Sequence, residues 1–296
     1  MAQIHAGVAT PRSRFHAALK SGGSLAIPGA YDVLSAKLIA EAGFDGVVVT
    51  GFGLSASLLG LPDTELYTMT ENLSVVRNVV NAVDIPVMAD GDTGYGNAIN
   101  VMRTVREFEA TGAASITIED QLSPKRCPAV SDHTEIVPLE EAVAKIRAAV
   151  EARQDPKFTI IARTDARDGS EALRRSLAYV QAGADVIKPI SKCFTSLEAL
   201  RAFRSACDRP LAVSVVGWLA RELDRTELMS IGGIVTWPFV PLLTVTAALR
   251  QNLAALKVAV RSNDLPVPMT GEADFKQFIG FAEIERLERK FLTGAG

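Results

Sequence analysis

Two aspartates separated by one small residue, Asp90 and Asp92, follow an apolar run that ends at Ala89, and a glycine-rich turn comes next. Side chains alternate along a strand, so residues two apart point to the same side of its end. Two carboxylates placed together repel each other unless a cation or a proton lies between them. Mg²⁺ suits such a pair and leaves positions for substrate oxygens. By itself the motif fits a metal site and a turn after a buried strand equally well.

A third carboxylate, Glu119, ends the next apolar run, residues 116–118. Acidic residues at strand ends are also common as helix caps. Three strand-end carboxylates in two adjacent units nevertheless favour a metal site. We therefore predict Asp90, Asp92 and Glu119 as ligands of Mg²⁺, with Mn²⁺ as an alternative ion.

Cys127 follows Lys125 and Arg126 in a long polar loop, residues 121–137. Such loops in compact enzymes are often lids or binding loops. A thiol beside two cations is expected to have a lowered pKa and to act as a general acid or nucleophile. The flanking Lys, Arg and Pro favour this over a buried, inert cysteine. His133 in the same loop, as a lone histidine, is more often structural.

Arg163 ends another apolar run, residues 160–162, and Asp165 follows it. A guanidinium binds a carboxylate or phosphonate through two hydrogen bonds. Asp165 is expected to orient Arg163, although a purely structural Arg–Asp pair remains the alternative.

About eight units of a short apolar strand followed by a helix position these residues. The strands are apolar on both faces, as in parallel sheets covered by helices. Polar residues recur where the strands end, which favours a (β/α)8 TIM barrel with its active site at that mouth over an open doubly wound sheet. Residues expected to face the mouth are Tyr31, Asp32, Thr50, Gly51, Asp90, Asp92, Glu119, Arg163, Asp165, Lys188 and Ser214.

Beyond the barrel we predict a helix over residues 241–260 and a second helical segment over residues 275–291. The apolar side of the second segment needs cover from the barrel or from a neighbouring subunit. We assign residues 1–260 to the barrel and residues 261–296 to a C-terminal helical extension.

The composition, 48% hydrophobic and 22% charged over 296 residues, is that of a folded globular protein. A net charge of −3 gives no basic surface for nucleic acid. Three scattered cysteines do not form a disulfide framework. We expect no signal peptide and no membrane span, because residues 1–14 lack an apolar core of that kind and no apolar run approaches about 20 residues. We expect a cytoplasmic protein with no membrane partner.

From about residue 15 to residue 185, ordered motifs resemble the isocitrate lyase/phosphoenolpyruvate mutase superfamily. They are Gly29-Ala30-Tyr31-Asp32, Thr50-Gly51-Phe52-Gly53, Gly60-Leu61-Pro62-Asp63, Ala89-Asp90-Gly91-Asp92-Thr93-Gly94-Tyr95-Gly96, Ile118-Glu119-Asp120-Gln121, Pro124-Lys125-Arg126-Cys127 and Ile161-Ala162-Arg163-Thr164-Asp165-Ala166.

The resemblance implies Mg²⁺ held by Asp90 and Asp92, with Glu119 assisting through water, and a 2-oxo acid or its enolate on the metal. It also implies a homotetramer, a dimer of dimers, with C-terminal helices swapped between subunits. By the same resemblance, the substrate carboxylate is bound by Thr50, Gly51, Phe52 and Arg163, Asp63 is a catalytic-site aspartate, and Cys127 protonates the enolate carbon. We add Tyr31 and Ser214 as substrate-binding residues and Lys125 as a catalytic one.

The sequence departs from the superfamily pattern in three places. Pro128-Ala129 replaces the Gly-His of the lyase loop. The Glu at the end of the sixth strand is replaced near Lys188-Pro189-Ile190, and the seventh strand ends in Ser214-Val215-Val216-Gly217. In the superfamily, these positions take part in acid–base chemistry and bind the distal part of the substrate. We therefore expect this half of the pocket to differ from the superfamily pattern.

We predict a Mg²⁺-dependent lyase that cleaves a 2-hydroxy acid, such as a methylisocitrate or an alkylmalate, to a 2-oxo acid through an enolate held on the metal. The alternatives are a phosphonate or carboxyphosphonoenolpyruvate mutase, a phosphonopyruvate hydrolase, an oxaloacetate decarboxylase or hydrolase, and a non-catalytic homologue.

Overall fold

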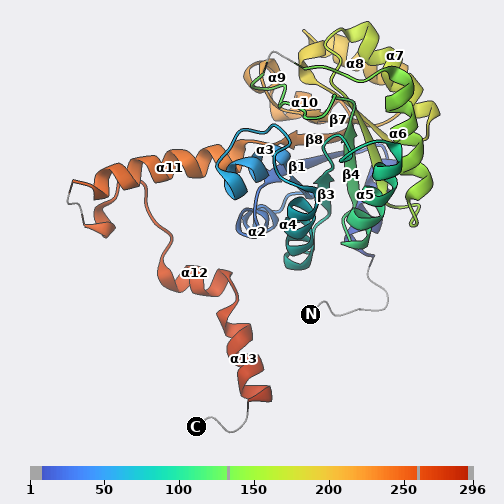
Figure 1. Ribbon diagram of the computed structural model, residues 1–296. Helices are drawn as coiled ribbons and strands as arrows, with labels where there is room; N and C mark the ends of the chain where they lie inside the picture. Colours follow the sequence, from blue (N-terminus) through green and yellow to red (C-terminus); the bar gives the residue numbers. More distant parts are fainter. Residues whose placement is uncertain (1–8, 132–133, 259–260, 293–296) are drawn as a thin grey trace. The chain divides into compact units, whose positions relative to one another are not determined.

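Eight parallel strands close into a barrel in the order of the sequence, from β1 to β8, with helices around it (Figure 1). The computed structural model describes residues 9–131, 134–258 and 261–292. The predicted (β/α)8 barrel is therefore confirmed. The strands are β1 Ser24–Ala30, β2 Val47–Val49, β3 Val87–Asp90, β4 Ser115–Glu119, β5 Thr159–Thr164, β6 Val186–Pro189, β7 Leu211–Ser214 and β8 Gly233–Trp237.

Helices follow the strands as the 3.6-residue periodicity predicts. That periodicity predicts helices over residues 69–82, 139–152 and 197–207, and these are the bounds of α4, α6 and α8. Sequence patterns missed the first helix and the short helices after β2 and β7. The helices of the barrel unit are α1 Pro11–Lys20, α2 Val33–Glu41, α3 Gly51–Leu54, α4 Met69–Ala82, α5 Ala98–Ala110, α6 Leu139–Ala152, α7 Gly169–Gln181, α8 Leu197–Cys207, α9 Trp218–Glu222 and α10 Arg225–Met229.

The barrel interior is filled by one cluster of apolar side chains from seven of the strands, including Ile27, Met88 and Ile161. Phe15 and Leu19 of α1 join this cluster, so α1 closes the amino-terminal end of the barrel. A second, larger cluster lies between the strands and the surrounding helices. Because α1 packs against the amino-terminal end of the barrel, polar side chains can occupy the opposite end, where the carboxyl-terminal ends of the strands lie.

Strand register brings the polar strand ends together. Glu119 of β4 pairs with Arg163 of β5, and Arg163 pairs with Lys188 of β6. On the other side of the mouth, Ser214 of β7 pairs with Thr236 of β8. Residues far apart in sequence are thereby neighbours at one mouth.

The chain divides into two compact units between Leu242 and Leu243. Its last helices are α11 Val240–Leu256, α12 Glu272–Phe278 and α13 Phe281–Phe291. The single helical segment predicted over residues 275–291 is wrong, because Gly280 adopts a φ of 92° and separates α12 from α13. The expected domain boundary at residue 260 lies outside the described residues. The same holds for His133. Within the described ranges, no helix is long and apolar enough to cross a membrane.

Candidate active site

The turn after β3 is held against β4 by its backbone. The amide of Gly91 donates to the carbonyl of Thr117 at 2.8 Å, and the amide of Glu119 donates to the carbonyl of Asp92 at 2.9 Å. A Cβ at Gly91 would lie 2.7 Å from the Thr117 oxygen, so the close approach requires glycine. Asp92 itself has a φ of 48°, in the left-handed region. The turn therefore positions two carboxylates through backbone geometry.

Gly51, at the start of α3, faces both aspartates. Its amide donates to Asp90 Oδ2 at 3.1 Å. A Cβ at this glycine would lie 3.3 Å from Asp90 Oδ2 and 3.1 Å from Asp92 Oδ1. The two carboxylate oxygens and the Tyr67 hydroxyl, 2.6 Å from such a Cβ, thus converge beside Gly51, where only a residue without a side chain fits.

Lys125 reaches into the mouth from the loop after β4. Its ammonium lies 2.7 Å from Asp63 Oδ1 and 3.0 Å from Asp92 Oδ1, and its side chain is 2% exposed. Burial opposes the charged ammonium, but Asp92, Glu119 and Asp63 outweigh this and hold the pKa of Lys125 well above its usual value. Lys125 therefore stays a cation between two aspartates.

Arg163 bridges two more carboxylates, Glu119 at 2.6 Å and Asp165 at 2.8 Å. Burial by itself would lower the pKa of Arg163. The charges of Asp165 and Glu119 outweigh this effect and raise the pKa further above its already high value. The predicted orienting contact from Asp165 is present in this structure. The same guanidinium also forms an ion pair with Glu119.

The carboxylates differ in their tendency to ionise. Burial raises the pKa of Asp92 to about 6, with Asp90 and Asp63 adding to the effect and Lys125 opposing it. At Asp90, burial is outweighed by Lys125, Lys188 and Arg163, and the pKa is lowered. Burial raises the pKa of Glu119 despite Arg163. A cation close to these groups would favour all three in the ionised form.

Carboxylate oxygens, which this mouth supplies, are the ligands that a hard divalent cation prefers. The carboxyl groups of Asp63, Asp90, Asp92, Glu119 and Asp165 share this mouth with the basic side chains of Lys125, Arg163 and Lys188. As the side chains stand, no three His, Cys, Asp or Glu residues among those described are grouped as metal ligands. Lys125 and Arg163 hold the carboxylates instead, so a metal ion would compete with them for Asp92 and Glu119.

Cys127 is buried, only 8% exposed, and the prediction of an exposed thiol with a lowered pKa is wrong. Burial and the nearby charge of Asp63 raise the pKa of the thiol, while Lys125 and Arg163 have smaller opposing effects. The Cys127 amide donates to the carbonyl of Asp63 at 3.1 Å, so the loop packs against residue 63. The thiol is therefore protonated at neutral pH, as a proton donor must be.

Glu65 ties the Cys127 loop to the aspartate turn. One of its carboxylate oxygens accepts hydrogen bonds from the Ser123 hydroxyl at 2.6 Å and the Lys125 amide at 3.0 Å. The other accepts a hydrogen bond from the Thr93 hydroxyl. Nothing in the sequence marks Glu65 as part of the site, since only the fold brings residues 65, 93 and 123 together.

Two tyrosines were also missed by the sequence analysis. The hydroxyls of Tyr67 and Tyr95 both donate to Asp92 Oδ2. Burial, then the charge of Asp92, raises the pKa of both tyrosines well above its usual value, so they remain donors. Tyr95 lies within the glycine-rich motif itself and was recognisable there, whereas nothing in the sequence marks Tyr67.

The other predicted substrate residues occupy neighbouring strand ends. Thr50 caps α3, its hydroxyl accepting from the Gly53 amide at 3.1 Å, and the Phe52 ring lies 4.5 Å from that of Phe239. Tyr31 follows β1 and is half-buried. Ser214 ends β7, with its hydroxyl 3.2 Å from that of Thr236.

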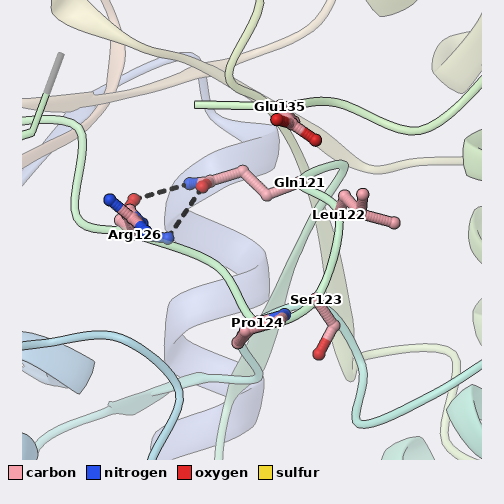
Figure 2. Close-up of a pocket in the computed structure, with 6 residues that line it drawn as sticks. All are labelled: Gln121, Leu122, Ser123, Pro124, Arg126 and Glu135. Atoms are coloured by element: carbon pink, nitrogen blue, oxygen red, sulfur yellow. Dashed lines mark hydrogen bonds between the residues drawn. The ribbon is translucent and has the colours of Figure 1, made fainter. Parts of the chain in front are cut away.

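A cavity of about 450 Å³ adjoins the loop after β4 (Figure 2). Its lining residues are Gln121, Leu122, Ser123, Pro124, Arg126 and Glu135. The Gln121 amide nitrogen donates to Glu119 Oε1 at 3.1 Å and to the Arg126 carbonyl at 3.0 Å. Gln121 therefore connects this cavity to the carboxylates of the mouth.

A barrel with acidic and basic side chains at its carboxyl-terminal mouth defines an enzyme-like fold of the TIM-barrel class. The family model for phosphoenolpyruvate phosphomutase matches residues 15–276, and the chain belongs to that family.

Two curated relatives are lyases. The chain is 42% identical to 2,3-dimethylmalate lyase of Eubacterium barkeri, over 90% of this chain and 93% of the relative. It is 34% identical to 2-methylisocitrate lyase of Shewanella oneidensis, over 94% of this chain and 96% of the relative. A solved structure of phosphonopyruvate hydrolase in complex with oxalate and Mg²⁺ superposes with a TM-score of 0.86, at 32% identity over 96% of this chain and 100% of that chain. The predicted superfamily is confirmed, and the predicted lyase class agrees with both curated relatives.

Proposed function

We propose that this chain is a Mg²⁺-dependent lyase that cleaves a carbon–carbon bond in an alkylmalate-like or methylisocitrate-like 2-hydroxy acid. The observation that supports it most is the convergence of Asp90 and Asp92 beside Gly51, at a mouth that also holds Arg163, together with a protonated thiol on the loop that carries Lys125. The names of two relatives, a dimethylmalate lyase and a methylisocitrate lyase, support the same reaction class.

Asp90, Asp92 and Glu119 are the residues that would hold Mg²⁺. When bound, the ion supplies electrophilic stabilisation of negative charge on substrate oxygens. Arg163 binds the carboxylate next to the substrate hydroxyl, through the two-pronged geometry of its guanidinium. Thr50, Gly51 and Phe52 bind the same carboxylate through the start of α3, and Tyr31 and Ser214 border the pocket.

The bond cleavage needs a base and an acid. Asp63, held by Lys125 at 2.7 Å, takes the proton of the substrate hydroxyl. The oxygen electrons form the carbonyl of the 2-oxo acid, and the electron pair of the broken C–C bond passes to the neighbouring carbon. Cys127 donates its proton to that carbon, a role that requires a protonated thiol, which the raised pKa provides.

The test is a panel of 2-hydroxy di- and tricarboxylates, oxaloacetate and phosphonopyruvate, with pyruvate and glyoxylate measured as products. We expect metal-dependent release of a 2-oxo acid from an alkylmalate or a methylisocitrate. Cys127→Ser should abolish turnover and retain binding of Mg²⁺ and oxalate, while Cys207→Ser, a buried cysteine of α8, serves as the control. Unchanged turnover in Cys127→Ser would refute the acid role.

Phosphonate chemistry is a second candidate function. The structural match to a phosphonopyruvate hydrolase favours it, because Arg163 suits a phosphonate as well as a carboxylate. Phosphate or phosphoenolpyruvate formed from phosphonopyruvate would identify this activity in the same panel. Pyruvate from oxaloacetate alone would identify a decarboxylase, and no product from any compound would favour a non-catalytic homologue.

We also propose a cytoplasmic homotetramer, a dimer of dimers in which the C-terminal helices are exchanged between subunits. The described cysteines are all free, which suits a reducing compartment. Large apolar side chains of α13, including Phe281, Ile284 and Phe291, are 47%, 55% and 66% exposed. Such a surface is typical of a subunit interface.

A further inference from the structure

Lys188 is an inward-facing cation at the end of β6. Val186, two residues earlier, belongs to the apolar cluster inside the barrel. Side chains alternate along a strand, so Lys188 points to the same side as Val186, one layer closer to the mouth. Its register partner is Arg163 of β5. Two cations therefore lie side by side on neighbouring strands.

Lys188 differs from the other two cations of the mouth in having no acidic partner. Lys125 contacts Asp63 and Asp92, and Arg163 contacts Glu119 and Asp165. Lys188 forms no hydrogen bond or ion pair with the residues that the structure describes. Burial and the charge of Arg163 lower its pKa, while Asp90, Glu119 and Asp165 have smaller effects in the opposite direction. Lys188 is half-buried, so its unpaired ammonium loses part of its contact with water and is stabilised when an anion binds there.

The strand ends beyond Lys188 offer space and a neutral hydroxyl. Ser214 ends β7, the next strand of the barrel, 3.2 Å from the Thr236 hydroxyl. Gly217 follows with a φ of 58°, and a Cβ built there would meet nothing within 4 Å. No carboxylate belongs to the residues that end β7 and β8, so this side of the mouth repels an incoming anion less than the Asp90 side does.

We infer that Lys188 binds the second carboxylate of the substrate, the one on the fragment that receives the electron pair. This inference rests on the proposed lyase function and narrows its substrates to 2-hydroxy dicarboxylates and larger polyacids. When the C–C bond breaks, the new electron pair delocalises into the carboxylate next to the reacting carbon. A cation at that carboxylate stabilises the developing charge, more strongly in the transition state than in the bound substrate.

The activity test compares the wild type with Lys188→Gln and Lys188→Arg on the best diacid of the substrate panel and on its half ester at the second carboxyl. We expect Lys188→Gln to lower kcat/KM for the diacid about 10- to 150-fold, the range for losing a charged hydrogen bond. The half ester should be poor for the wild type and little affected by the substitution. Lys188→Arg should recover part of the loss. Equal loss on diacid and half ester would overturn the inference.

The binding test uses malate and lactate, which share a 2-hydroxy carboxylate and differ by the second carboxylate. Calorimetry with and without Mg²⁺ should show tighter binding of malate to the wild type and a loss of that preference in Lys188→Gln. Lys20→Gln, an exposed lysine at the end of α1, is the matched control. An unchanged preference in Lys188→Gln, or none in the wild type, would overturn the inference. Circular dichroism verifies that each variant is folded.

The two tests separate this inference from the proposed function. If the wild type cleaves no 2-hydroxy acid but its preference for malate depends on Lys188, the lyase proposal fails and the anion site stands. If the wild type is an active lyase and Lys188→Gln keeps the preference for the diacid and for malate, the anion site is refuted and the lyase proposal is retained. Borohydride trapping of a pyruvate adduct on Lys188 would also overturn the inference, because the lysine would then act as an amine nucleophile.

Discussion

Lys125 and Asp92, which are 33 residues apart in sequence, form a buried ion pair of 3.0 Å at the mouth of the barrel. The same ammonium binds Asp63 at 2.7 Å. One loop lysine thus neutralises a proposed metal ligand and holds the proposed base. Because Asp92 is bound by Lys125 here, the loop and a metal ion at the proposed site would share one carboxylate.

Lys125→Met should destabilise the protein and abolish turnover. Removing one partner of a buried pair leaves Asp63 and Asp92 uncompensated and lowers the free energy of unfolding by about 3–5 kcal/mol. Chemical denaturation measures this loss, and Mg²⁺ should reduce it because the ion replaces the missing positive charge. Lys157→Met, an exposed lysine, is the control. Full stability of Lys125→Met without metal would contradict the buried pairing.

Asp92→Asn should remove the stabilisation conferred by Mg²⁺ and oxalate. In the wild type, ligand at a hundredfold excess over its Kd stabilises the folded state by about 2.7 kcal/mol, which raises Tm. The variant should show no ligand-dependent change in Tm. Asp84→Asn, at the opposite end of β3, should respond like the wild type. A Tm shift that persists in Asp92→Asn would rule out this residue as a ligand.

Gly51→Ala should weaken Mg²⁺ binding with only a moderate loss of stability. The new methyl group would lie 2.6 Å from the Tyr67 hydroxyl and 3.1 Å from Asp92 Oδ1, so both must move. Overpacking of this kind costs about 1–3 kcal/mol. Calorimetric titration with Mg²⁺ measures the effect, and Gly271→Ala, where nothing lies within 4 Å, is the control. Wild-type affinity in Gly51→Ala would place the metal elsewhere.

Alkylation of Cys127 should still accelerate as the pH rises beyond 9. Burial raises the thiol pKa, so the folded protein holds the proton to higher pH than the unfolded chain, and the reactive thiolate appears late. Peptide mapping after iodoacetamide gives the rate profile. Cys193 and Cys207, with pKa values of about 12 and about 11, should respond at still higher pH, and urea-unfolded protein is the control. A plateau below pH 8 would contradict the acid role.

Phe281→Glu combined with Ile284→Glu should reduce the oligomeric state. Both side chains are exposed on α13, and charges there would be costly in an apolar interface. Light scattering coupled to gel filtration measures the mass. Lys290→Glu on the same helix is the control, because it changes an already polar position. A tetramer that survives the double substitution would exclude α13 from the interface.

Sequence patterns predicted the barrel because its signals are local. Apolar strands, capped amphipathic helices and polar strand ends recur along the chain, and each is read from a few neighbouring residues. The Asp90–Asp92 motif and Arg163 were found for the same reason, since both follow directly from the end of an apolar run. The helix break at Gly280 was missed because a helical apolar pattern continues across it.

The state of Cys127 could not be predicted in this way. Its sequence neighbours Lys125 and Arg126 suggest a thiolate, yet the Lys125 ammonium is directed to Asp63 and Asp92. Burial and Asp63, which is 64 residues away, decide the pKa of the thiol instead. Tyr67 and Glu65 became part of the site in the same manner, through contacts that no spacing indicates.

By itself, the sequence determined the barrel, the family motifs and the acidic turn, because residue types within one strand–helix unit specify them. The tertiary structure alone decided which charges are paired and which are not. Closing the barrel gives Lys125 and Arg163 two acids each and places Lys188 beside Arg163, with no acid paired to it in the part of the chain that the structure describes. Pairing depends on distances of a few ångströms between different strands and loops, and such distances exist only in the folded chain.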